Sequence, residues 1–292
     1  MNQNELKIKI DEAVNDLISQ LKEQISDKIE CLALTGSYAI NKISLDKPDV
    51  NIFLCLNEKA SADTYIEIGE ILTDLVNKYS DYFSIKPEFR PFKFPSPFVE
   101  KEPEVLMNLN ICNILDKQGD FPFGVPKSVL IGFLNMQKVV YGKDVLGSLD
   151  LNFNKEYIIK VAFRDLPIMR IQLKNAPLAY NLKKHLSLLM NESIVNGKTI
   201  AYLGVELALV DKELKNNQAL EFIRDKEKLV SFFQERYDQK TADFVKEILE
   251  ARKNFNSWKN NKEKVYQTFR AAYGLAESIW SRLLKEVLRN KL

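Results

Sequence analysis

The chain has 292 residues, 46% of them hydrophobic and 28% charged, which is enough apolar content for one large or two modest globular domains. Its 42 basic and 40 acidic residues give a formal net charge of +2, so the charge balance gives no reason to expect a nucleic-acid or membrane partner. The N-terminus is polar and the apolar runs are short. We therefore expect neither a signal peptide nor a transmembrane helix, and a cytoplasmic protein.

The cysteines and the histidine argue against several kinds of metal and catalytic site. Cys31, Cys55 and Cys112 are isolated in the sequence, lie in apolar surroundings and lack the spacing of metal ligands. We expect them to be small buried hydrophobic side chains in a reducing compartment. The single histidine, His185, argues against a zinc cluster and against a Ser–His–Asp triad.

The first expected elements are a helix and a strand that ends in a glycine turn. Apolar residues recur at helical intervals over 5–29, and the apolar run at 30–34 predicts a buried strand. The run ends at Gly36-Ser37, where a glycine allows the backbone to turn sharply and to bring N–H groups close to an anion. A short helix is expected at 38–43.

A second apolar run opens at Asp49-Val50-Asn51 and closes at Leu56. Residues two apart on a strand share a face, so Asp49 and Asn51 point the same way, beside the glycine turn if the two strands pair. Two carboxylates there would bind Mg²⁺, which prefers hard oxygen ligands. Asn51 supplies a carbonyl oxygen without charge and is a weak ligand. Taken singly, the Gly-Ser pair is typical of an ordinary turn, and Asp49 of a solvated strand end.

In order and spacing, the stretch LALTGSYAINKISLDKPDVNIFLCL resembles the polymerase-β-like nucleotidyltransferase superfamily. The signature of that superfamily has Gly followed by Gly or Ser after one strand, and two carboxylates at alternate positions of the next. The resemblance implies an α+β fold with a mixed sheet flanked by helices and a nucleotide bound by Gly36 and Ser37. It also implies a catalytic, metal-binding Asp49, with Mg²⁺ and ATP or another nucleoside triphosphate. Asn51 stands where the second carboxylate is expected, and a protein without these cofactors is the alternative.

The next elements are a helix over 61–83, an extended segment over 84–94 and a strand over 104–115. In the resembling family a strand after the metal-binding pair carries a third carboxylate, the general base. Here Asn108 and Asn110 hold the comparable positions, and an amide cannot accept that proton. Glu104 and Glu88 are alternative catalytic carboxylates, on the strand's start and on the extended segment.

A further helix is expected over 126–140, and it leads into VVYGKDVLGSL at 139–149. This stretch resembles antibiotic-type nucleotidyltransferases, many of which have Tyr-Gly, a charged residue and Asp at this distance. The alternative interpretation is a plain helix exit through Gly142. Either way, we place the end of the nucleotidyltransferase-like domain near Leu149.

The remainder of the chain is predicted to be helical. Helices over 155–175 and 176–191 contain Pro167 and Pro177, where kinks or breaks are expected. Four more amphipathic segments follow, at 199–215, 228–237, 241–255 and 262–292. The apolar stripe over 265–288 is typical of a core, with a homodimer or partner interface as its alternative use.

This layout resembles the aminoglycoside and lincosamide nucleotidyltransferases, in which a helical substrate domain follows an α/β nucleotide domain. The resemblance implies a nucleotidyltransferase-like domain at 1–149 and a helical bundle at 150–292, with a small-molecule acceptor as a second partner. Basic residues of the second half either line a cleft for an acidic ligand or lie on solvated helix surface. Those residues include Lys183, Lys184, Arg252 and Lys253.

Three hypotheses for function follow. In the first, the protein has a nucleotidyltransferase fold, binds a nucleotide and has lost or weakened catalysis, because carboxylates are missing at Asn51, Asn108 and Asn110. In the second, it is an active metal-dependent enzyme that moves a nucleoside monophosphate to a small-molecule hydroxyl. In the third, it is a helical interaction module with a vestigial enzyme domain.

Overall fold

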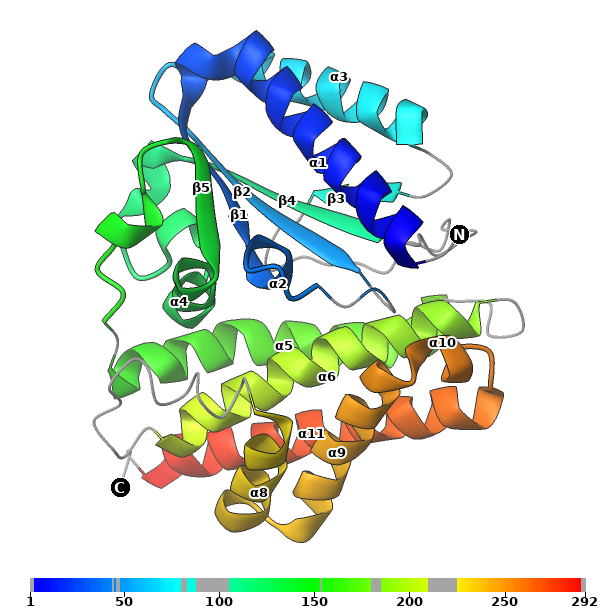
Figure 1. The fold of residues 1–292 in the computed structure, drawn as a ribbon. Helices are drawn as coiled ribbons and strands as arrows, with labels where there is room; N and C mark the ends of the chain where they lie inside the picture. The colour runs from blue at the N-terminus through cyan, green and yellow to red at the C-terminus, as the bar shows by residue number, and fades with distance from the viewer. Residues whose placement is uncertain are drawn as a thin grey trace. The chain divides into compact units, whose positions relative to one another are not determined.

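The structure is a computed structural model that describes residues 3–43, 45, 48–79, 83–87, 105–152, 154–179, 185–209 and 225–289. The described residues divide into two compact units, one that ends at Leu151 and one that begins at Asn152 (Figure 1). The first unit contains a sheet and the second is helical, and each has a hydrophobic cluster of its own. The predicted fold class, an α+β unit followed by an all-α bundle, is confirmed.

The first unit is built on a mixed sheet of five described strands in the order β3-β4-β2-β1-β5. The strand β1 pairs antiparallel with β2 and with β5, whereas β2 and β3 each pair parallel with β4. The strands span Ile29–Thr35 (β1), Asp49–Leu56 (β2), Phe83–Pro87 (β3), Val105–Asn113 (β4) and Gln137–Gly142 (β5).

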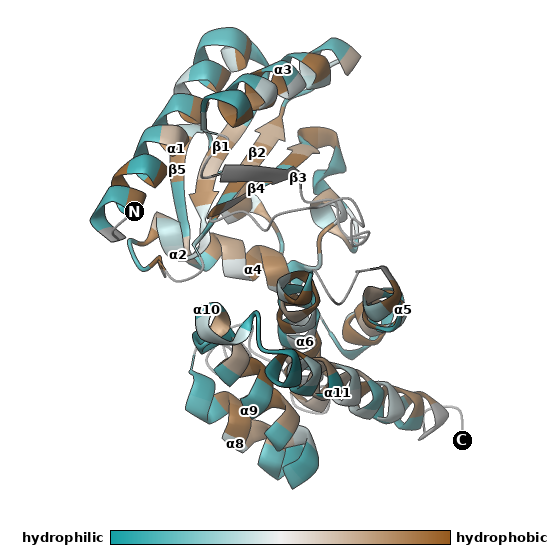
Figure 2. Cartoon of the chain, turned by 90° about the vertical axis from the view of Figure 1, so that its right-hand side faces the viewer, coloured by the Kyte–Doolittle hydropathy of each residue, from teal (hydrophilic) through white to brown (hydrophobic). Residues whose placement is uncertain are grey.

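Two long amphipathic helices cover one face of this sheet. They are α1 (Gln3–Ile25) and α3 (Ala62–Tyr79), and Figure 2 shows hydrophilic residues along one side of α1 and largely hydrophobic β1 and β2. The apolar side chains of both helices pack against alternate residues of the strands, among them Ile52, Leu54 and Met107. Because side chains alternate along a strand, Asp49, Asn51 and their neighbours project from the opposite face.

Short elements complete the first unit. The helix α2 spans Gly36–Ala39, two residues earlier than expected, and α4 spans Lys127–Asn135. Single 3₁₀ turns lie at Ser26–Lys28 (η1), Ile114–Lys117 (η2), Pro122–Gly124 (η3) and Leu146–Ser148 (η4).

The expectation of a helix through Val140, with an exit at Gly142, is wrong. The helix α4 ends at Asn135, and residues 137–142 form the edge strand β5 against β1. The consecutive Val139, Val140 and Tyr141 favour a strand because β-branched and aromatic side chains fit a pleated surface. The Tyr-Gly stretch is therefore part of the sheet.

The second unit consists of α5 (Lys155–Ala179), α6 (Leu186–Leu209), α8 (Lys226–Arg236), α9 (Gln239–Lys253), α10 (Phe255–Trp258) and α11 (Lys262–Arg289). The expected breaks at Pro167 and Pro177 are absent, since α5 runs through both prolines. Its packing against α6 and α11 compensates for the lost backbone hydrogen bonds. Two of the predicted segments, 176–191 and 199–215, lie partly in the continuous helix α6, and residues 180–184 and 210–224 are outside the described residues.

The apolar stripe of α11 forms the core of this unit. Val265, Leu275, Ala276, Ile279 and Leu283 are all fully buried. This is the first of the two uses that its sequence pattern predicts. Within the described residues, no helix is both long and apolar enough to cross a membrane.

Candidate functional site

The glycine turn and the start of β2 lie against one another. Gly36 follows β1 with a φ of +75°, in the left-handed region that suits a residue without a side chain. A Cβ atom placed on it would lie 3.1 Å from Nδ2 of Asn51. Any side chain at residue 36 would therefore be strained by the positive φ and would crowd Asn51. The backbone that leads into Ser37 lies beside the polar end of β2.

The short helix α2 is held to α1 by a tyrosine. The Tyr38 hydroxyl donates a hydrogen bond of 2.8 Å to Oδ1 of Asp11, which also accepts from Nζ of Lys7 at 2.7 Å. Burial and the hydrogen bond to Asp11 raise the pKa of Tyr38, so the phenol stays protonated and continues to donate. The turn is thereby fixed to the helix that packs on the far face of the sheet.

A row of polar residues crosses the sheet at the level of this turn. In the strand register, Gln137 of β5 is paired with Thr35 of β1, Thr35 with Asn51 of β2, and Asn51 with Asn108 of β4. Directly paired residues share a face. Asp49 lies two residues before Asn51 on the same face of β2. Three residues singled out in the sequence, Asp49, Asn51 and Asn108, are therefore neighbours on this face.

Hydrogen bonds connect the two asparagines to Asp49. Nδ2 of Asn108 donates to Oδ1 of Asn51 at 2.9 Å, and Nδ2 of Asn51 donates to Oδ2 of Asp49 at 3.4 Å. Asn108 is only 7% exposed, so its amide is held in a low-dielectric setting where a hydrogen bond is strong. We call these three residues, Asp49, Asn51 and Asn108, the amide chain.

The next residue on this face of β4 is Asn110, which is 7% exposed. Its Nδ2 atom is buried and has no hydrogen-bond partner among the described residues. Asn110 is paired with Phe53, whose ring centroid lies 5.5 Å from that of Phe123 in η3 and 6.5 Å from that of Phe133 in α4. An unused donor thus lies at the border between the amide chain and a cluster of aromatic rings.

These residues do not fit a divalent cation. Mg²⁺ requires oxygen ligands and is held in proteins by carboxylates together with substrate phosphates. Asp49 is the one carboxylate of the amide chain, and the oxygen of Asn51 already accepts a hydrogen bond from Asn108. No group of three or more carboxylate, cysteine or histidine side chains able to hold a metal occurs in the described parts of the chain. The two alternative carboxylates, Glu88 and Glu104, lie outside those parts.

The three cysteines, isolated in sequence, are neighbours in the sheet. Cys31 of β1 is paired with Cys55 of β2, and Cys55 with Cys112 of β4. All three are buried free thiols, as predicted. Burial raises the pKa of Cys31 to about 11 and also raises the pKa of Cys112, which lies against Cys55. Cys31 and Cys112 are therefore unionised at neutral pH, and all three cysteines are buried as small side chains.

Sequence reasoning missed Gln137, because its segment was assigned to a helix. Its Nε2 donates to Oδ1 of Asp144 at 3.0 Å, and Asp144 also accepts from the backbone N–H of Gly147 at 2.8 Å. The aspartate that follows Tyr-Gly-Lys therefore orders the turn η4 and orients Gln137. The only signal in the sequence was the β-branched pair at 139–140, which indicates a strand.

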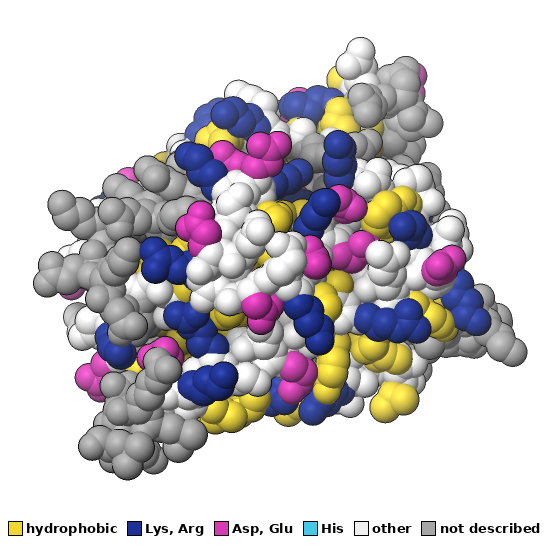
Figure 3. All heavy atoms as spheres, turned by 90° about the horizontal axis from the view of Figure 1, so that it is seen from below, with side chains coloured by type: hydrophobic (Ala, Val, Ile, Leu, Met, Phe, Trp, Pro, Cys, Tyr) yellow, Lys and Arg dark blue, Asp and Glu magenta, His cyan; other side chains and the backbone are white. Residues whose placement is uncertain are grey.

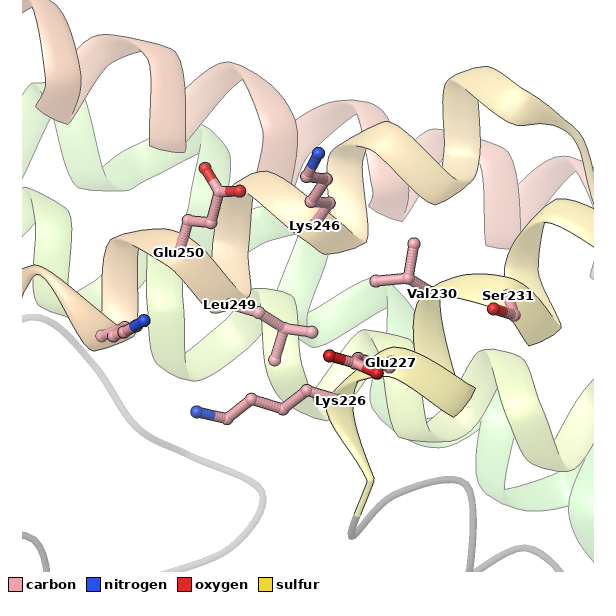
Figure 4. Close-up of a pocket in the computed structure, with 8 residues that line it drawn as sticks. Lys226, Glu227, Val230, Ser231, Lys246, Leu249 and Glu250 are labelled. Carbon is pink, nitrogen blue, oxygen red and sulfur yellow. The ribbon is translucent and has the colours of Figure 1, made fainter.

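The helical unit has an open groove of its own, of about 440 Å³, between α8 and α9. Figure 4 shows Lys226 and Glu227 on α8 beside Lys246, Leu249 and Glu250 on α9. Lys253 also lines it, whereas Lys183 and Lys184 lie outside the described residues. Both basic and acidic side chains line this groove, and both kinds lie on the face shown in Figure 3.

The chain was compared with family models, curated proteins and solved structures, and only the solved structures show a similarity, which concerns the fold. No family model and no curated protein matches the chain. Among solved structures, the chain is similar to the spectinomycin adenyltransferase AAD(9) from Enterococcus faecialis, in a crystal structure with ATP and spectinomycin. The TM-score is 0.53 and the identity is 11%, over 91% of this chain and 98% of that one. The two chains share a fold, in which a part with a mixed sheet and helices is followed by a helical part.

Proposed function

We propose that this protein binds a nucleoside triphosphate through the turn at Gly36 and Ser37, and that nucleotidyl transfer is weakened or lost. The observation that carries the proposal is the amide chain, in which Asn51 and Asn108 occupy a face of the sheet beside a glycine turn and Asp49 is the one carboxylate. A fold shared with an adenyltransferase that was crystallised with ATP supports the choice of ligand.

In this proposal each unit has a separate role. The domain predicted at 1–149 supplies the nucleotide site, and the helical bundle predicted at 150–292 corresponds to a substrate domain for a small molecule. Gly36 allows the backbone N–H groups of the turn to approach the phosphates. Asp49 and Asn51 face the same region from β2. The proposal includes no membrane or nucleic-acid partner. Formation of a homodimer is a separate question, which the molar mass of the protein in solution decides.

The binding proposal is tested by calorimetric titration of ATP into the wild type and two glycine variants. Gly36→Ala introduces a Cβ against Asn51 at a positive φ, so we expect a loss of at least about tenfold in affinity, equal to about 1.4 kcal/mol. Gly69→Ala is the matched control, because a Cβ there meets no atom within 4 Å. Equal affinities in both variants would exclude the turn from the site, and no ATP binding by the wild type would refute the proposal.

The alternative is an active metal-dependent nucleotidyltransferase that transfers a nucleoside monophosphate to a small-molecule hydroxyl. It is favoured by the extent of the shared fold, which covers 98% of the adenyltransferase chain. Glu88 or Glu104 would then supply the missing carboxylate. Robust pyrophosphate release from ATP with Mg²⁺ and an acceptor, abolished in a folded Asp49→Ala variant, would establish this alternative and refute weakened catalysis.

A further inference from the structure

In the amide chain, hydrogen bonds occupy the side-chain oxygens that would otherwise coordinate a bridging cation. The side chain of Asn51 has one oxygen, Oδ1, which accepts a hydrogen bond from Asn108. Its amide nitrogen, Nδ2, donates a hydrogen bond to the Asp49 carboxylate. An N–H group cannot ligate a metal, because it has no free lone pair to offer. The side chain of Asn51 therefore turns its donor, not its acceptor, towards Asp49, the one carboxylate among the three residues of the amide chain.

We propose that the Asn51 amide takes the place of a divalent cation, so that ligands bind this face of the sheet without Mg²⁺. The inference rests on the proposed function for the identity of the ligand, a nucleoside triphosphate. It goes further in assigning cation independence to two residues, Asn51 and Asn108. Replacing both with aspartate converts the face into a divalent-cation site.

Asn110 provides an independent observation in favour of an oxygen-bearing ligand. It lies two residues after Asn108 on the same face of β4, is 7% exposed, and has a buried Nδ2 without a partner among the described residues. A buried donor left unpaired is costly unless a ligand or water accepts from it. Such a donor suits a phosphate, ribose or base oxygen, and it repels a cation.

The first experiment measures cation binding alone, with no nucleotide present. Mn²⁺ is titrated calorimetrically into the wild type, the double variant Asn51→Asp/Asn108→Asp, and the control Asn77→Asp. Asn77 is exposed on α3, the helix that covers the opposite face of the sheet from Asp49. Circular dichroism establishes that each variant is folded before it is titrated.

We expect Mn²⁺ binding in the double variant at least about tenfold tighter than in the wild type, and no gain in the Asn77→Asp control, because clustered carboxylates are what the cation needs. Tight Mn²⁺ binding by the wild type would overturn the inference. So would a folded double variant that gains nothing. If the double variant does not fold, the single variant Asn51→Asp replaces it, with the same two outcomes.

The second experiment compares ATP binding with Mg²⁺ and with excess chelator. Equal affinity, within about twofold, is expected for the wild type, whereas the double variant is expected to bind ATP only with Mg²⁺. Loss of wild-type binding in chelator would overturn the inference and leave nucleotide binding intact. No ATP binding under any condition would instead refute the proposed function, and the Mn²⁺ titration would still decide the cation question.

Discussion

The Asn51 side chain donates its amide N–H to the Asp49 carboxylate, two residues before it on β2, at 3.4 Å. The contact joins two positions at which a nucleotidyltransferase motif is expected to carry two acids. Side by side on one strand face, two carboxylates repel one another unless a cation lies between them. An amide in the second position removes that repulsion, so the strand is stable without a metal.

Asn108 holds Asn51 in this orientation, and its removal should weaken the fold. Asn108→Ala leaves Oδ1 of Asn51 without its 2.9 Å partner. We expect the free energy of unfolding to fall by about 1–3 kcal/mol, the cost of a buried group left unpaired. Urea denaturation measures this. Asn77→Ala, at an exposed position on α3, is the control, and an equal loss in both variants would show that the contact with Asn51 contributes nothing.

Substitution of Asn110 should change the stability of the fold and the affinity for ATP in opposite directions. Asn110→Leu replaces a buried amide, whose Nδ2 has no partner among the described residues, with an apolar side chain of the same branched shape, so the free energy of unfolding should rise by about 1 kcal/mol. ATP affinity should fall in the same variant, because the free donor is lost. A variant that gains stability and keeps its full affinity for ATP would exclude Asn110 from the binding face.

Gly142 is required by the packing of β5 on β1. Its φ is +76°, and a Cβ atom there would collide with the backbone carbonyl of Glu30. Gly142→Ala should therefore lower the free energy of unfolding by at least about 2 kcal/mol. The control Gly69→Ala, in open space on α3, should raise it by about 0.5–1 kcal/mol. Similar denaturation midpoints for the two variants would contradict this account of the edge strand.

The thiol of Cys31 should make stability depend on pH in the alkaline range. Burial raises its pKa from 9.0 to about 11 in the folded chain. An unfolded chain therefore releases this proton first as the pH rises, so the stabilising contribution is complete below pH 9 and is lost between about pH 9 and 11. Unfolding midpoints measured across this window should fall less steeply in Cys31→Ala. Identical slopes would show that the thiol does not titrate as described.

The sequence predicts the elements of the candidate site better than its contacts. Alternation of side chains along β2 is enough to place Asp49 and Asn51 on one face, and glycine chemistry is enough to predict the turn at Gly36. The pairing of Asn51 with Asn108 could not be predicted, because it joins parallel strands that are far apart in the sequence. The same limit hides the row formed by Cys31, Cys55 and Cys112.

Two secondary-structure predictions are wrong, for physical reasons that the structure identifies. The predicted helix over 126–140 includes residues 137–140, because a short apolar run fits the period of a helix as well as that of a strand. Pairing with β1 makes these residues part of the strand β5. The helix α5 continues through Pro167 and Pro177, where local propensity predicts breaks, because its apolar side packs against α6 and α11. Tertiary contacts outweigh local preference in both cases.

The most direct test of the central claim is the sign of the change in ATP affinity when Asp49 loses its charge. ATP is titrated into the wild type and Asp49→Asn, each in excess chelator. Without a cation, the Asp49 carboxylate repels the triphosphate, so the variant should bind ATP about fivefold more tightly, as expected for ~1 kcal/mol of screened repulsion. Binding that requires Mg²⁺ in the wild type and is abolished by Asp49→Asn would contradict the account and identify a working metal site.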